Sequence, residues 1–355
     1  MKKLYIGLAI LLVVSLVAAF SCAPAPAPPT EPAAPAIKPM MIKLSHALPA
    51  EDMRAIMANK FKELMEKKSD GQVKVAIYPA GQLFSQKDEI EGAAAGAVEI
   101  LSWCPYTAKR FDTAFTLGLI PNLFPTWDNW YKFWEDPNGG GYISELSEKI
   151  GLYVGREWID TAGIIIYVTK KPVRKIEDFK GMKLRCPLAI EGGAKGVGAS
   201  AVPISTLEVF TALQTGMVDG IAFTNLMIVK GFGWYSVARY ATDFPITWGG
   251  FGTLACSKSW WDGLSPEMRS LVEASVKEAA AYTRSLLATT AAETKAWLMT
   301  DKGFGKGFYD MAKEDPAENK KFRDVIRQAM INQYVGTWPG SFVAAIEKHS
   351  GSKLR

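Results

Sequence analysis

Arg185 is the residue of this chain whose type and setting most clearly indicate chemistry. It follows a short predicted strand at 182–184, and Pro187 ends that strand. An arginine side chain stays charged and presents its N–H donors in a rigid fork, which matches the two oxygens of a carboxylate. Two interpretations follow from the residue alone. Arg185 either pairs with a nearby acid, such as Glu157 or Glu191, or binds the carboxylate of a ligand.

The chain carries no motif of a known catalytic or metal centre. It has two histidines, His46 and His349, no cysteine pair at zinc spacing, and none of the motifs HExxH, GxSxG or GxxxxGK[ST]. The glycine cluster at 192–198 lacks the GxGxxG order and indicates flexible helix packing. His46 is expected to be packed or hydrogen-bonded, with a place in a cleft as the alternative. The sequence therefore predicts a binding function, with no catalytic residue, no cofactor and no metal ligand.

The segments around Arg185 alternate between strand and helix patterns. In the first half, strand patterns occupy 42–46, 73–78 and 98–103, and helical patterns occupy 52–68 and 88–97. This order predicts an open parallel sheet, whose ligands bind beyond the carboxyl ends of its strands. The second half has strand patterns at 164–169, 182–184 and 220–224, and a helical pattern at 208–214. Ser265 and Pro266 then begin a long helical region without Gly or Pro from 267 to 302.

The N-terminus has the pattern of a bacterial export signal. Two lysines precede an apolar run at 4–20 and then Cys22, which is typical of a lipoprotein signal over 1–22 with Cys22 as the lipidation site. An uncleaved membrane anchor is the alternative, because the run approaches the shortest length that spans a bilayer. The Pro/Ala-rich residues 23–40 predict an extended tether. We therefore expect a periplasmic or extracytoplasmic protein, anchored to the outer face of the cytoplasmic membrane by lipidated Cys22.

The composition argues against a nucleic-acid partner. The chain has 355 residues and a net charge of +5, with no basic block interleaved with aromatic residues. Its length and its 48% hydrophobic residues suffice for two domains. Besides Cys22, an odd number of cysteines remains, which we expect to be small buried hydrophobic residues: Cys104, Cys186 and Cys256.

Six segments of the chain, taken in order, resemble one family of binding proteins. They are IKLSHALPAE, GQVKVAIYPAGQLFSQKDEIEGAAAGAVEI, LIPNLF, DFKGMKLRCP, EVFTALQTGMVDG and SKSWWDGLSPEMRSLVEAS. Together they are similar to the solute-binding subunits of TRAP transporters, the DctP-like periplasmic binding proteins. The resemblance covers nearly the whole mature chain, and by resemblance Arg185 is the residue that binds the ligand carboxylate.

The resemblance implies an α/β fold of two lobes, with a ligand cleft between the lobes and a long helix spanning both. Lobe I is expected over 41–162 plus 251–290, and lobe II over 163–250 plus 291–355. It also implies that the lobes close on a small organic acid, and that the closed form is recognised by TRAP-type membrane permease subunits.

Two departures from the family pattern bear on the ligand. Sialate- and dicarboxylate-type members have a second arginine where Ile165 stands, and an asparagine where Phe223 stands, so that Asn225 is the nearest amide. Both changes remove polar partners and add apolar surface. The aromatic residues in candidate cleft positions are Trp103, Tyr106, Phe124, Trp158, Tyr167 and Trp248, and core packing is the alternative for each. The departures predict a monocarboxylate with an apolar or aromatic body.

Two other functions stay open at this point. A lipoprotein of this kind can sense a ligand for a signalling partner, and the same two-lobe cleft can hold an extracytoplasmic enzyme. For the enzyme, the sequence shows no nucleophile or pair of acids that would meet in the cleft, as catalysis requires.

Overall fold

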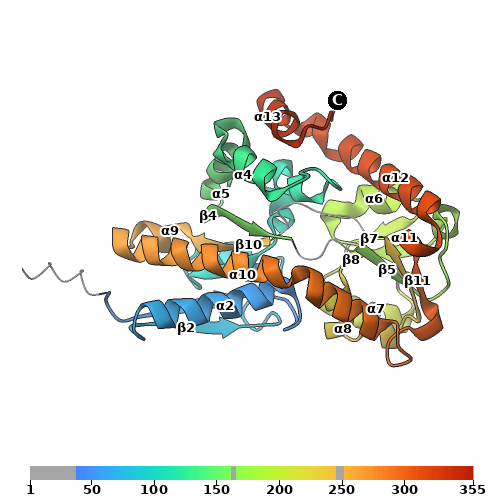
Figure 1. Ribbon diagram of the computed structural model, residues 1–355, viewed down its shortest axis with the longest axis horizontal. Helices are drawn as coiled ribbons and strands as arrows, with labels where there is room; N and C mark the ends of the chain where they lie inside the picture. Colours follow the sequence, from blue (N-terminus) through green and yellow to red (C-terminus); the bar gives the residue numbers. More distant parts are fainter. Residues whose placement is uncertain (1–36, 161–164, 245–251, 355) are drawn as a thin grey trace, which may run out of the picture. The chain divides into compact units, whose positions relative to one another are not determined.

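Two β-sheets flanked by helices form the part of the chain that the computed structural model describes, residues 37–160, 165–244 and 252–354 (Figure 1). The first sheet has the strand order β2-β1-β3-β10-β4. Its strands are β1 (Met40–Ser45), β2 (Val73–Tyr78), β3 (Ile100–Trp103), β4 (Leu152–Ile159) and β10 (Gly252–Ser257). Strand β1 pairs in parallel with β2 and β3, and β10 is antiparallel to β3 and β4. The predicted parallel β-α-β-α-β unit is confirmed. Its first strand begins at Met40, the last residue assigned to the tether.

The second sheet has the order β11-β9-β5-β8-β6-β7. Its strands are β5 (Ile165–Thr169), β6 (Lys183–Arg185), β7 (Ser200–Val202), β8 (Gly220–Thr224), β9 (Tyr240–Phe244) and β11 (Phe308–Asp310). Strand β6 is parallel to both of its neighbours, β7 and β8. Arg185 is the last residue of β6, so it stands at the carboxyl end of this parallel group, where ligands of open sheets bind.

Local sequence signals set the helix ends. The helices are α2 (Met53–Lys68), α3 (Glu89–Ala94), α4 (Trp127–Glu135), α5 (Tyr142–Lys149), α6 (Glu191–Gly196), α7 (Val209–Thr215), α8 (Leu226–Gly231), α9 (Lys258–Asp262), α10 (Pro266–Leu298), α11 (Met311–Glu314), α12 (Pro316–Tyr334) and α13 (Gly340–Ser350). Ser265 caps α10 by accepting a hydrogen bond from the Met268 N–H, and Pro266 takes its first position. Gly216 ends α7 in the left-handed region, at a φ of 79°.

Helix α10 runs along both sheets, as the resemblance implied (Figure 1). It packs against α2 of the first sheet and α8 of the second. Lys295 of α10 places its Nζ 2.6 Å from Asp243 of β9 and 2.8 Å from Asp310 of β11. The two-lobe α/β fold is therefore confirmed, while the exact lobe boundaries stay a prediction. No helix in the described ranges combines the length and the apolar character needed to cross a bilayer.

Candidate functional site

Arg185 is a buried cation whose partners are neutral. Its side chain is 5% exposed, its Nε donates to the Ile204 carbonyl at 3.1 Å, and its Nη2 donates to the Thr206 hydroxyl at 2.9 Å. No carboxylate of the described residues lies within ion-pair distance of it. Burial lowers the pKa of the Arg185 guanidinium, which still stays protonated in neutral water. Among the described residues, two of the five N–H donors of this guanidinium have a hydrogen-bond partner.

The acids proposed as structural partners of Arg185 pair elsewhere. Glu157 accepts from Arg284 at 3.2 Å, and Glu191 lies 3.3 Å from Lys195. The structural interpretation of Arg185 therefore loses both of its candidate partners. A buried, uncompensated guanidinium is costly, and it is expected where a ligand supplies the negative charge.

A short chain of hydrogen bonds links Arg185 to the first sheet. The Thr206 hydroxyl accepts from Arg185 and donates to Oε1 of Gln86 at 3.0 Å. Gln86 in turn hydrogen-bonds to the Tyr106 side chain. Burial raises the pKa of Tyr106, while the positive charges of Arg54 and Arg185 oppose that rise. The structure thus brings Tyr106, a predicted site residue, close enough to Arg54 of α2 and Arg185 of β6 for both charges to act on it.

Arg54 and Asp52 are site residues that the sequence argument missed. Arg54 of α2 is 1% exposed, and it grips the carboxylate of Asp52 at two points, with Nε to Oδ1 at 2.8 Å and Nη2 to Oδ2 at 3.0 Å. Its Nη1 also contacts the Cys104 sulfur. The signal available in the sequence was weak: Arg54 is a cation in the first turn of a helix, where the helix dipole favours acids.

Asn225, another predicted site residue, joins this pair from the second sheet. Its Nδ2 donates to Oδ2 of Asp52 at 3.2 Å, and its Oδ1 accepts from the Ile228 N–H at 2.8 Å to cap α8. Asn225 and Thr206 therefore each form a hydrogen bond with a residue of the first half of the chain, Asp52 and Gln86.

Two titratable groups near Arg54 are held neutral. Burial raises the pKa of the Glu89 carboxyl to about 8, although the charge of Arg54 opposes this. Burial lowers the pKa of His46 to about 4, and its Nδ1 accepts from the Leu48 N–H at 3.3 Å. Asp52 neutralises Arg54 by direct contact, whereas Arg185 has no carboxylate within ion-pair distance among the described residues, and the charge of Glu208 acts on it only from farther away.

Phe223 lies at a backbone irregularity of β8. Ile166 and Val168 of β5 pair with Thr224 and Ile221, so β8 has one extra residue between these pairs. Phe223 occupies this bulge with a φ of 56°, a conformation that a bulky side chain rarely adopts and that costs about 1–3 kcal/mol. Its ring fills the space beside Gly193 of α6, where an added Cβ would lie 2.3 Å from the Phe223 Cζ. Strain of this kind gathers at functional sites, because the surrounding structure must hold it in place.

The other aromatic candidates lie in apolar cores. Trp103 is fully buried and donates to the Thr107 hydroxyl at 3.0 Å, and Trp158 donates to the Gly155 carbonyl at 2.8 Å. Phe124 packs 5.3 Å from Trp130, measured between ring centroids. These surroundings match the core-packing alternative, and ligand contact by these residues stays a prediction.

Tyr167 is fully buried among four aromatic rings, Phe179, Phe223, Phe244 and Phe322. Ile165 belongs to β5, where its backbone pairs with Phe244. Trp248 and Cys22 lie outside the described residues. The three cysteines of the described part, Cys104, Cys186 and Cys256, are buried and free of disulfides, as expected for small hydrophobic residues.

Comparison with known proteins places these features in a family. The family model described as bacterial extracellular solute-binding protein, family 7 (DctP), matches residues 44–333. The C4-dicarboxylate-binding periplasmic protein of Rhodobacter capsulatus is 29% identical over 287 residues, which are 79% of this chain and 83% of that protein. The sialic acid-binding periplasmic protein of Vibrio cholerae is 28% identical over 227 residues, which are 61% of this chain and 67% of that protein.

Solved structures show the same fold. A TRAP periplasmic solute-binding protein of Shewanella oneidensis with bound succinate matches with a TM-score of 0.75 at 22% identity, over 88% of this chain and 99% of that one. One of Pseudomonas aeruginosa with bound L-malate matches with a TM-score of 0.72 at 22% identity, over 83% of this chain and all of that one, 100%. The chain therefore belongs to bacterial extracellular solute-binding protein family 7, the DctP family of TRAP-type solute-binding proteins.

Proposed function

We propose that this protein is the extracytoplasmic solute-binding subunit of a TRAP-type transporter, and that it captures an organic monocarboxylate with an apolar or aromatic body at Arg185. One observation carries the proposal: Arg185 is 5% exposed and has no carboxylate partner among the described residues. A ligand carboxylate supplies the missing charge and matches the fork of donors that Arg185 keeps available.

The charge balance of the cluster favours one carboxylate over two. Arg54 is occupied by Asp52 at two points, and Glu89 is neutral near pH 7 because burial raises its pKa to about 8. A second ligand carboxylate would therefore lack a free cation in the described cluster, and its desolvation would go uncompensated. Phe223 stands where sialate- and dicarboxylate-type members have an asparagine, and an apolar side chain at this position suits an apolar ligand body.

The ligands of the relatives support an organic acid as the ligand, but they do not indicate whether the rest of that ligand is polar or apolar. By their names, they bind C4-dicarboxylates and sialic acid, and the solved structures hold succinate and L-malate. Every one of these ligands carries at least one carboxylate, which is the group that Arg185 is suited to bind. The ligand proposed here differs in the body attached to that carboxylate, which is apolar or aromatic.

Capture proceeds by closure of the two lobes around the ligand. The carboxylate meets the free N–H groups of Arg185, and the hydrogen bonds from Thr206 to Gln86 and from Asn225 to Asp52 hold the sheets together. Excluding water from the cleft strengthens the ion pair, because the local dielectric constant falls. The closed form is then recognised by membrane permease subunits, and the lipid on Cys22 keeps the protein at the outer face of the cytoplasmic membrane.

A thermal-shift screen followed by calorimetry tests the proposal. The panel pairs hexanoate and phenylacetate with succinate and glucuronate, so that body and charge vary separately. Phenylacetate or hexanoate should raise the melting temperature most, and calorimetry should give a stoichiometry of one. Stabilisation by succinate alone would refute the monocarboxylate, stabilisation by glucuronate alone would refute the apolar body, and either result would leave the solute-binding function standing.

A further inference from the structure

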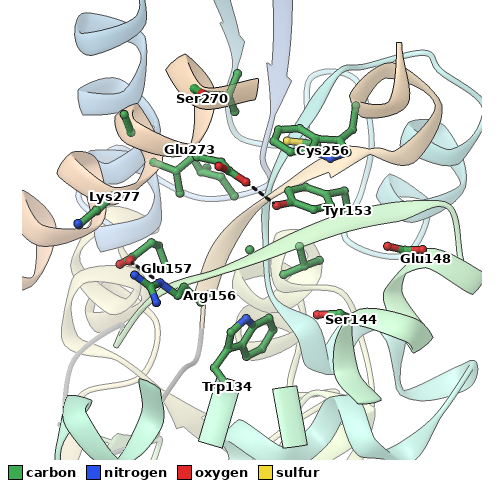
Figure 2. A pocket seen from close by; sticks show the side chains of 17 residues that line it. Trp134, Ser144, Glu148, Tyr153, Arg156, Glu157, Cys256, Ser270, Glu273 and Lys277 are labelled. Carbon is green, nitrogen blue, oxygen red and sulfur yellow. Dashed lines mark hydrogen bonds and ion pairs between the residues drawn. The ribbon is translucent and has the colours of Figure 1, made fainter. Parts of the chain in front are cut away.

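A second pocket lies at the edge of the first sheet, bounded by β4, α10 and the helices α4 and α5 (Figure 2). Its volume is about 580 Å³, within the range of small-molecule sites. Its lining includes none of the described residues of the Arg185 cluster. The pocket is therefore distinct from the cleft to which the proposed function is assigned.

Aromatic side chains form its walls. Trp134 of α4 faces the pocket from one side and Tyr153 of β4 from the other (Figure 2). Behind Tyr153 lies Trp261 of α9, stacked with it at 3.8 Å between centroids and an interplanar angle of 6°. The Tyr153 hydroxyl donates to Oε1 of Glu273 at 2.9 Å. Both the ring and the hydroxyl of Tyr153 are therefore held in place, so this wall of the pocket need not rearrange when a ligand binds.

Of the two positive side chains in the lining, one forms ion pairs and the other points outward. Arg156 pairs with Glu135 at 3.2 Å on the outside of α4 and lies 3.7 Å from Glu157. Lys277 points its Nζ away from the middle of the pocket (Figure 2). Neither cation offers its charge to the interior.

Two carboxylates of the lining have no cationic partner among the described residues. Glu273 interacts with the neutral Tyr153 hydroxyl, and Glu148 of α5 has no ion pair among the described residues. Glu157 differs from both, because Arg284 and the Tyr131 hydroxyl occupy its Oε2 at 3.2 and 2.9 Å. The lining therefore combines aromatic faces with two carboxylates that have no cationic partner among the described residues.

The floor of the pocket is the backbone of Gly155. Strand β4 bulges here, since Val154 and Trp158 pair with Ala255 and Thr253. A Cβ added at Gly155 would meet no atom within 4 Å, and the backbone there is not in the left-handed region. Gly155 thus leaves open space that a ligand can occupy and that a larger side chain would fill.

We propose that this pocket binds a small organic cation with an aromatic or apolar body. A cationic head group is attracted both to carboxylates and to the faces of aromatic rings, with an energy that grows as water is excluded. An anion would face Glu148 and Glu273, while Arg156 is paired with Glu135 and Lys277 points its Nζ away from the middle of the pocket. The apolar body would lie over Gly155 between Trp134 and Tyr153.

Calorimetry with 2-phenylethylammonium as the probe, at neutral pH, tests the site. The wild-type protein should bind it saturably at concentrations up to about 10 mM, and the isosteric neutral 2-phenylethanol at least about fivefold more weakly. Gly155→Leu fills the floor and should abolish binding of the probe. Glu273→Gln should weaken it about three- to tenfold.

Glu278→Gln is the matched control, because Glu278 lies on the same helix and pairs with Lys68 outside the pocket. It should bind the probe within twofold of wild type. Unchanged phenylacetate affinity in Gly155→Leu shows that this variant is folded and that the two sites are separate. The proposal is overturned if the wild type shows no saturable binding, if 2-phenylethanol binds as tightly as the cation, or if Glu273→Gln and Glu278→Gln behave alike.

Discussion

Two buried arginines, Arg54 of α2 and Arg185 of β6, act with their charges on the same tyrosine, Tyr106, and they differ in what neutralises them. Arg54 is held by Asp52 through two charge-assisted hydrogen bonds, whereas Arg185 is held by the Ile204 carbonyl and the Thr206 hydroxyl. Both are nearly free of solvent, at 1% and 5% exposure. A buried charge is tolerated when its partner is buried with it. We therefore assign Arg54 to the framework and propose that Arg185 is the cation that binds the ligand.

Removing the paired arginine, Arg54, should have the largest effect, and that effect is on stability. Arg54→Met should lower the free energy of unfolding by about 3–5 kcal/mol, because Asp52 is left as a buried charge without its cation. Denaturation by urea, followed by circular dichroism, measures the loss. The double variant Asp52→Asn/Arg54→Met should recover much of it, since no charge is then left unpaired. Equal stability of Arg54→Met and wild type would contradict the framework role.

Removing Arg185, by contrast, should affect ligand binding and not reduce stability. Arg185→Met should weaken binding of phenylacetate by about 2–5 kcal/mol, because the desolvated carboxylate loses its partner. The stability of the free protein should be kept or raised, since an uncompensated buried charge disappears. Calorimetry measures the first effect and thermal melting the second. Arg185→Lys is the matched control: it keeps the charge but not the fork, and should recover only part of the affinity.

The contrast between the two arginines also shows what the sequence could supply. Arg185 was found because its setting is local: a short strand, a proline and a family motif lie within a few residues. The strands at 73–78 and 220–224 were predicted to the residue for the same reason, since their apolar pattern and their turns are adjacent in the chain. The helix start at Ser265 is likewise a local signal.

The pairings that define the site are not local. Asn225 meets Asp52 across 173 positions, and Thr206 meets Gln86 across 120. A pattern of apolar residues shows that a side chain is buried, but not which other side chain it meets. The same limit explains Trp103 and Trp158: their type fits both a cleft and a core, and the structure surrounds them with core residues.

The pH dependence of stability gives a finer test of the neutral groups around Arg54. The pKa of Glu89 is raised to about 8, so between its ordinary value and pH 8 the folded state holds a proton that the unfolded state has lost. Stability therefore falls as pH rises through this window. The lowered pKa of His46, about 4, has the opposite sign but acts only below its ordinary value near 6.5.

The clean window is thus pH 6.5 to 8, where wild-type stability should fall by up to about 1.4 kcal/mol per pH unit. Glu89→Gln carries no ionisable group and should give a flat curve over the same range. Urea denaturation at several pH values provides the measurement. A parallel fall in both proteins would show that Glu89 is ionised in the folded state, and the charge balance that singles out Arg185 would then change.

The smallest expected effect concerns the contact between Phe223 of β8 and Gly193 of α6. In Gly193→Ala, the new methyl group would lie 2.3 Å from the Phe223 ring, so the ring must shift. Overpacking of this kind costs about 1–3 kcal/mol, and we expect roughly half of it, about a three- to tenfold loss, to appear in phenylacetate affinity by calorimetry. Phe223→Leu in the Gly193→Ala background removes the colliding atoms and should restore stability. It should also weaken phenylacetate more than hexanoate, because an aromatic body loses its aromatic neighbour. If both acids weaken equally, Phe223 fills space without selecting the ligand, and Arg185 alone determines which acids bind.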